Sequence, residues 1–426
     1  MSTSTELVPV EPTAPEDEVR ALARLAFDEL AAGVGGIWTM QRGIAERVFW
    51  ALGGTGQVVE WVYDAVGAGV YRALTESSRA AGRAGGRLVA AGGAGRRQLS
   101  TTPGGAALIG ALNGLIGDAL ERERSQLHQP LGVRVDGRPV APIRPELEPA
   151  FPGAGPRLVV FLHGLMETEF AWWAGAQASG GTYGARLAHD LGCTPVYVRY
   201  NRGRHVSENG ASLAGLLEAL VVEWPVEVSE LALVGHSMGG LVARSACHQG
   251  GRQGAEWVRL VRHIVSLGTP HLGAPLAQAV HYAAAGLGAL PETRALAAFL
   301  RRRSAGIRDL RQGSLVDEDW RGRDPDALRA AACQEVPLLE GVTHCFVSAT
   351  VTRSARHPVG RLVGDTLVLV PSASGRGRTR RIPFEEEYGA HVGGTHHLAL
   401  LNHPAVYERL RGWLAEAPRA ARPAPR

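Results

Sequence analysis

The pentapeptide Gly235-His236-Ser237-Met238-Gly239 has residue types and a spacing that could do chemistry. Its Gly-x-Ser-x-Gly pattern is that of a nucleophile elbow, a sharp strand-to-helix turn that exposes a serine hydroxyl. The chain has 55 glycines in 426 residues, so the pattern also arises by chance and its context must decide. A strand-like apolar run precedes the serine, a helix-like segment follows it, and Gly235 and Gly239 permit their close approach. The sequence therefore predicts a nucleophilic Ser237.

A second element of such chemistry lies upstream, where an apolar run over 157–162 ends in His163-Gly164. In acyl-transfer hydrolases the loop after this strand donates one backbone N–H to the oxyanion, and the residue after the nucleophile donates the other. We therefore assign the oxyanion hole to the N–H groups of Leu165 and Met238. Gly164 lets the chain turn close to the substrate, and His163 is interpreted as a residue that braces the loop and not as a base.

An acid and a histidine should follow the serine in that chain order. Asp365 lies at the edge of a stretch that we interpret as β-rich, and His396 and His397 precede a helix that begins near Pro404. His397 would take the proton of Ser237, and Asp365 would orient its ring. The residues alone separate His396 from His397 poorly. Other acids compete for the role but lie in a polar stretch that we expect to be solvated: Asp317, Asp319, Asp324 and Asp326.

Several segments between about 150 and 416 carry a family resemblance. They are 163–165, 199–207, the elbow at 235–239, Gly-Thr-Pro-His-Leu-Gly-Ala-Pro at 268–275, 304–310, and His-Leu-Ala-Leu-Leu-Asn-His-Pro at 397–404. Together they make the sequence resemble α/β-hydrolase lipases and esterases, in particular the bacterial branch similar to GPI-inositol deacylases. The resemblance implies that His397 is the catalytic histidine. Relatives often carry an acid two positions later, where this chain has Ala399, so a contact made there is expected to be missing.

The order of elements predicts an α/β-hydrolase fold, with a mostly parallel sheet flanked by helices. A hairpin with an Asp-Gly turn over 133–140 should form the antiparallel edge of the sheet. Strands are expected near 158–163, 194–200, 230–235, 262–267 and 344–350. We expect a disordered N-terminus at 1–17, a helical N-terminal region at 18–125, a hydrolase domain at 130–416 with a helical cap at about 276–337, and a disordered tail at 417–426.

The N-terminal region carries two sets of apolar residues, each on one helical face: Val59, Val62, Val66 and Val70, and Leu108, Leu112, Leu115 and Ala119. The apolar stretch from Gly104 to Gly117 is shorter than the roughly 18 residues of a membrane span. We favour packing on the hydrolase domain or self-association over peripheral membrane contact. Because the sheet, elbow and triad all lie beyond residue 130, we expect a chain that starts near Gln126 to keep the serine's reactivity.

Composition narrows the function classes further. Arginine supplies all 45 basic residues and the formal net charge is +4, without a basic stripe interleaved with aromatic residues, so no nucleic-acid partner is expected. The four cysteines show no CxxC pair, and we expect neither a metal nor a cofactor. Residues 1–17 lack the basic and apolar regions of a signal peptide, which favours a cytoplasmic location.

These patterns predict a serine hydrolase that cleaves carboxylic esters of lipidic or other apolar small molecules through an acyl-enzyme. Two alternatives stay open. The first is acyl transfer to an alcohol by the same triad. The second is a non-catalytic binding protein with this fold, against which the intact set of Ser237, Asp365 and His397 argues.

Overall fold

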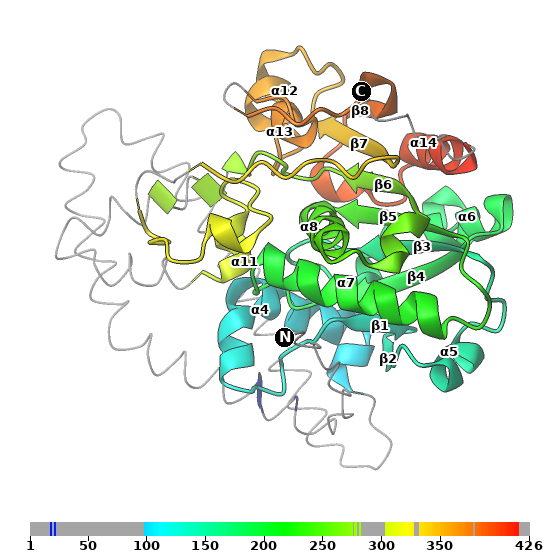
Figure 1. Ribbon diagram of the computed structural model, residues 1–426. Coiled ribbons are helices and arrows are strands. Elements are labelled where there is room, and N and C mark those ends of the chain that lie inside the picture. Colours follow the sequence, from blue (N-terminus) through cyan, green and yellow to red (C-terminus); the bar gives the residue numbers. More distant parts are fainter. Residues whose placement is uncertain are drawn as a thin grey trace, which may run out of the picture.

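The computed structural model describes residues 18, 21–22, 98–275, 277–278, 281–282, 303–327, 332–377 and 380–416 (Figure 1). The predictions for residues 1–17, for the stripe from Val59 to Val70, for the tail at 417–426 and for most of the cap between 276 and 302 lie outside these residues.

One sheet organises the described part of the chain, with its eight strands in the order β2-β1-β4-β3-β5-β6-β7-β8. The strands are β1 (Gly132–Val135), β2 (Arg138–Val140), β3 (Arg157–Leu162), β4 (Thr194–Arg199), β5 (Glu230–His236), β6 (Val261–Leu267), β7 (Thr343–Thr350) and β8 (Gly389–Gly393). All pairs from β4 to β8 are parallel, whereas β1 pairs antiparallel with β2 and β4. The mostly parallel sheet with an antiparallel hairpin at its edge is confirmed.

The hairpin turn follows from its two central residues. Asp136 and Gly137 have φ angles of 49° and 79°, the left-handed conformation that a two-residue Asp-Gly turn requires. This turn sets the register, in which Val133 pairs with Val140.

Helices cover both faces of the sheet (Figure 1). The longer ones are α6 (Tyr183–Leu191), α7 (Val206–Glu223), α8 (Met238–Gln253) and α14 (Pro404–Ala415); the shorter ones are α5 (Arg144–Ala150), α11 (Ala305–Asp309), α12 (Pro358–Val363) and α13 (Val370–Ala373). Side chains of β3 show why both faces are covered: Leu158, Val160 and Leu162 join the core under α7 and α8, whereas Val159 and Phe161 join the core under α6 and α14. Because a strand buried on both faces needs apolar residues at every position, this run reads as continuous and not alternating.

Single turns of 3-10 helix connect several of these elements. They are η2 (Leu99–Thr101), η3 (Glu169–Trp173), η4 (Gln177–Ser179), η5 (Glu256–Leu260), η7 (Asp317–Asp319), η8 (Glu386–Tyr388) and η9 (His397–Leu400). No helix among the described residues combines the length and the apolar character needed to cross a membrane.

Helix α4 (Pro103–Arg122) packs on the domain through a face lined by small residues. The buried residues are Ala106, Ile109, Gly110, Asn113, Gly114, Gly117 and Leu120. The predicted stripe of Leu108, Leu112, Leu115 and Ala119 is only half-buried, so that prediction placed the packing face wrongly. Glycines on the buried face bring the helix backbone itself against its neighbours, which a search for bulky apolar residues cannot detect.

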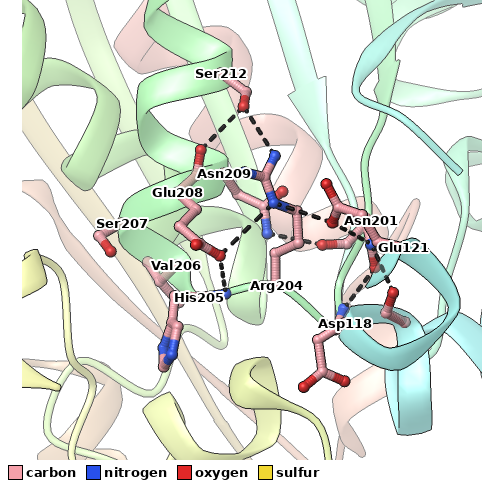
Figure 2. A network of polar contacts seen from close by, with 12 residues as sticks. Asp118, Glu121, Asn201, Arg204, His205, Val206, Ser207, Glu208, Asn209 and Ser212 are labelled. Carbon is pink, nitrogen blue, oxygen red and sulfur yellow. Dashed lines mark hydrogen bonds and ion pairs between the residues drawn. The ribbon is translucent and has the colours of Figure 1, made fainter. Parts of the chain in front are cut away.

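A polar network fastens α4 to the loop that follows β4 (Figure 2). Asn201 Nδ2 donates to the Gly117 carbonyl at 2.9 Å. The Arg204 guanidinium lies 3.3 Å from the Glu121 carboxylate and 3.6 Å from that of Glu208 at the start of α7. Helix α4 is therefore joined to the sheet and to α7 by backbone contact as well as by charge.

We expect Gly203→Ala to destabilise the protein, because a Cβ there would lie 2.5 Å from the backbone of Gly117 in α4. Forced overpacking of this kind costs about 1–3 kcal/mol of unfolding free energy. The matched control is Gly215→Ala in α7, which has nothing within 4 Å of the added Cβ and should be neutral or slightly stabilising. Denaturant unfolding compares the two variants, and equal stabilities would contradict the close docking of α4.

Candidate active site

Ser237 lies on the turn between β5 and α8, with φ 54° and ψ −122°. A non-glycine residue in this region of backbone space is strained, and such strain recurs at functional sites. Its backbone N–H donates to the Leu267 carbonyl at 2.8 Å. A Cβ added at Gly239 would lie 2.3 Å from the Leu162 carbonyl oxygen, so the helix meets the sheet too closely for any side chain there. The predicted elbow geometry is present.

His397 and Asp365 form a buried pair, with side chains 3% and 1% exposed. His397 Nδ1 donates to Asp365 Oδ2 at 2.7 Å, and the His397 backbone N–H donates to the Asp365 carbonyl at 2.7 Å. The N–H groups of Leu367 and Val368 donate to Asp365 Oδ1 at 3.0 and 2.8 Å, which fixes the carboxylate. Asp365 lies between α12 and α13, so the interpretation of its surroundings as β-rich was wrong.

The remaining ring nitrogen, His397 Nε2, is buried and has no hydrogen-bond partner among the described residues. The ring packs on Gly268, where an added Cβ would lie 3.1 Å from Nδ1. Gly268 directly follows Leu267, whose carbonyl accepts from Ser237 N, so the ring lies beside the serine turn. Catalytic hydrogen bonds are often long in ligand-free enzymes and tighten when substrate binds.

The competing residues differ in burial and partners. His396 is exposed, whereas His397 is buried. Asp319 is buried and accepts from Leu315 N at 2.9 Å, so the expectation that it is solvated was wrong. Sequence reasoning did not single out the buried Asp309, which accepts from His205 Nδ1 at 3.0 Å and from Val206 N at 2.7 Å, at the start of α7.

In the described ranges, no cluster of three or more His, Cys, Asp or Glu residues could hold a metal ion.

The loop after β3 approaches the serine at Gly164. A Cβ added there would lie 3.1 Å from Ser237 Cβ, so the loop and the elbow touch. Leu165 follows in this loop, and Met238 is the first residue of α8, whose N–H has no acceptor inside its own helix. The two assigned oxyanion donors thus lie on the two segments that meet at Ser237.

His163 occupies a bracing position behind this loop. Its buried ring stacks on Tyr200 at 4.5 Å, and the Tyr200 hydroxyl donates to the His163 carbonyl at 2.6 Å. Burial and the nearby Arg202 charge lower the pKa of His163 well below its ordinary value. Because a neutral imidazole carries no charge that burial would desolvate, His163 fits a packing role behind the loop.

Helix α4 packs directly against the loop that follows β3. A Cβ added at Gly114 would lie 2.7 Å from the Leu165 carbonyl oxygen and 2.6 Å from Met166 Sδ. Ser304 Oγ donates to the Gly114 carbonyl at 2.6 Å. A chain that starts near Gln126 would lack this contact, and the expectation that it keeps the serine's reactivity stays a prediction.

An ion pair between His236, which is buried, and Glu167, which is mostly buried, was not found from the sequence. It connects the loop after β3, the turn at Ser237 and the segment that carries His397. Glu167 accepts from Gly164 N at 2.6 Å and from His236 Nδ1 at 2.9 Å. His236 Nε2 donates to the His397 carbonyl at 3.2 Å, so both ring nitrogens are donors and the ring is protonated. Burial is the largest single influence on the pKa of Glu167 and raises it, but the charge and hydrogen bond of His236 together with the Gly164 N–H hold this pKa below its ordinary value. Burial lowers the pKa of His236, but Glu167 raises it by more.

The topology, the elbow and the neighbouring loops define the fold class of the protein, an α/β-hydrolase fold. Within it, residues 219–286 match the model of the family described as the PGAP1-like alpha/beta domain. The matched segment runs from the end of α7 through the elbow and past β6, and it confirms the resemblance drawn from the sequence motifs.

Solved structures that resemble the chain include lipases and esterases, all at low identity. Lipase BlEst2 from Bacillus licheniformis in its mature form is 18% identical, with 67% of this chain and 98% of that chain covered and a TM-score of 0.39. Its propeptide form is 19% identical, with 64% and 53% covered and a TM-score of 0.41. Esterase PF2001 from Pyrococcus furiosus is 12% identical, with 62% and 82% covered and a TM-score of 0.34. No curated protein matches the chain.

The Glu167–His236 pair predicts a pH dependence of stability. Since folding raises the pKa of His236, its contribution is complete below 6.5 and is lost as the pH rises through the raised value. Since folding lowers the pKa of Glu167, its contribution is complete above 4.5 and is lost as the pH falls through the lowered value. The unfolding free energy of the wild type, relative to that of Glu167→Gln, should therefore be largest between these values and decline above 6.5.

Denaturant unfolding at a series of pH values measures this difference. Glu386→Gln is the control, because Glu386 is an exposed carboxylate paired with Arg376 and not with a histidine. Parallel pH curves for the wild type and Glu167→Gln would show that the pair does not form.

Proposed function

We propose that the protein is a serine hydrolase that cleaves carboxylic esters of lipidic or other apolar substrates. Ser237 is the nucleophile, His397 the general base and Asp365 the residue that orients it. The observation that carries this proposal is the buried 2.7 Å bond between His397 and Asp365, beside a serine at φ 54°. A strained turn and a buried polar pair each lower the free energy of unfolding, and neither is needed to pack the core.

The chemistry of such a triad gives each of these groups one task. Ser237 Oγ attacks the ester carbonyl carbon while His397 Nε2 takes the hydroxyl proton, and Asp365 stabilises the imidazolium. The N–H groups of Leu165 and Met238 bind the developing oxyanion. His397 then gives its proton to the departing alcohol, which leaves an acyl group on Ser237. Water attacks this acyl-enzyme with His397 again as the base, the carboxylic acid leaves, and Ser237 regains its proton.

Exposed apolar side chains around the proposed site favour an apolar acyl group. Met166, Leu367 and Leu398 are 41%, 38% and 52% exposed, and each lies within two residues of an assigned site residue. The loops that carry them follow the carboxyl ends of parallel strands, which meet at one edge of such a sheet. Exposed apolar side chains that neighbour the assigned residues in this way favour a lipidic or other apolar ester over a charged substrate.

Replacement of the nucleophile gives the first test. We expect Ser237→Ala to lower the turnover of p-nitrophenyl butyrate by about 10³- to 10⁶-fold, because the acyl-enzyme can no longer form. The melting temperature should stay close to that of the wild type, since only one oxygen is lost from a half-buried position. Hydrolysis by purified Ser237→Ala at near the wild-type rate would overturn the proposal.

The adjacent histidines offer a matched pair of variants. His397→Ala should lose activity on the scale of Ser237→Ala, whereas the exposed His396 should tolerate alanine with at most a small change. Asp365→Asn should also be severely impaired, because an amide in place of the carboxylate favours the wrong ring tautomer. Rates of p-nitrophenyl ester hydrolysis compare the three variants, and a greater loss at His396 would refute the assigned base.

A further inference from the structure

A small polar cavity lies where the β1–β2 hairpin, β4 and the segment that follows α4 meet. Its volume is about 50 Å³, and its walls include Glu18, Ser100, Gln129, Arg134 and Arg199. None of the residues assigned to ester chemistry lines it. A single buried water needs roughly 10–15 Å³ measured in this way, so the cavity has room for a small polyatomic ion.

Two residues that line the cavity, Arg134 and Gln129, carry buried hydrogen-bond donors for which the described residues provide no acceptor. Arg134 is 6% exposed, and its Nη1 donates to the Val133 carbonyl at 3.2 Å, while its Nε has no hydrogen-bond partner among the described residues. Gln129 is 4% exposed, and within the described ranges its Nε2 has no hydrogen-bond partner either. Buried donors without acceptors are costly, and more so when one belongs to a cation. Burial and the neighbouring Arg199 charge lower the pKa of Arg134 to about 9, which is the direction expected of a cation short of negative charge.

The charges around the cavity do not balance. Arg134, Arg199 and Arg202 are all buried here, and Arg202 Nη2 lies 3.2 Å from Gln129 Oε1. Two carboxylates of the described part of the chain lie at this cavity, those of Glu169 and Glu18. Glu169 is bonded to Arg199, with Oε2 2.6 Å from Nε, and Glu18 accepts from Ser100 N at 3.0 Å. Counted over the residues that the structure describes, one buried positive charge therefore lacks a counter-charge, because Glu167, whose field also reaches Arg202, is paired with His236.

We propose that this cavity binds one small monovalent oxyanion, of the size of acetate or dihydrogen phosphate, held by Arg134 and Gln129. A guanidinium presents parallel N–H groups that match the oxygens of a carboxylate or a phosphate. The anion supplies the missing negative charge and the two missing acceptors. It also joins the segment after α4 to strand β1, and it thereby stabilises the docking of α4 independently of chemistry at Ser237.

Thermal unfolding of the full chain tests the proposal, with sodium acetate and sodium phosphate each compared with sodium chloride at equal ionic strength. We expect at least one oxyanion to raise the melting temperature of the wild type by about 1–3 °C at ten times its dissociation constant. Arg134→Met should lose this specific shift and should melt higher than the wild type in chloride, since it removes an unpaired buried charge. Arg138→Met is the matched control, because Arg138 lies on the same hairpin but is exposed, and it should keep the shift.

Two further variants make the result decisive. Gln129→Leu should also lose the oxyanion-specific shift, which keeps the test available if Arg134→Met does not fold. Glu18→Gln removes a negative charge from the wall and should tighten oxyanion binding several-fold in a calorimetric titration. If both oxyanions shift the wild type, Arg134→Met and Gln129→Leu equally, or shift none of them beyond chloride, the cavity holds only water and the proposal fails.

Discussion

A serine held at φ 54° stores backbone strain that the rest of the domain must compensate, and the arrangement of the site follows from how it does so. The turn exists because β5 ends where α8 begins, and because α8 approaches the sheet within contact of the Leu162 carbonyl. The bond from Ser237 N to the Leu267 carbonyl fixes the turn from the side of β6. Buried apolar strands on both sides of β5 make this support rigid.

Three loops then meet at the turn, and each is held by backbone groups as well as by side chains. The histidine loop is tied to Asp365 through two bonds, one from the ring and one from the main chain. The loop after β3 is tied to the elbow by Glu167, which bonds both Gly164 N and the His236 ring. His236 in turn bonds the His397 carbonyl. His236 therefore links the loop after β3, the turn at Ser237 and the segment that carries His397, a role that its place beside Ser237 in the sequence does not suggest.

Local patterns predicted the parts of the structure that depend on neighbours in sequence. The apolar runs gave the strands from β3 to β7, the Asp-Gly pair gave the hairpin, and glycine spacing gave the elbow. Strand β8 was missed because its sequence, Gly389–Gly393, is short and half-exposed and carries no apolar run. The packing face of α4 was misplaced because glycines, and not large side chains, make the contact.

At the site, too, local sequence patterns predicted some residues, whereas residues brought together only by the fold were missed. The chain order of serine, acid and histidine pointed to Asp365 and His397, and burial separates His397 from its exposed neighbour. Glu167 could not be found, since a single glutamate in a loop carries no pattern, and only the fold brings it to His236. The buried state of Asp319 was hidden for the same reason, because its partners are the backbone N–H groups of a turn.

The central claim is that Ser237 is a uniquely activated nucleophile. Labelling of the folded wild-type protein with a fluorophosphonate, followed by intact-mass and peptide mapping, measures this directly. We expect one phosphonyl adduct per chain, located on Ser237, with labelling strongly slowed in His397→Ala. A folded protein that takes no label, or that takes it on another residue, would contradict the account.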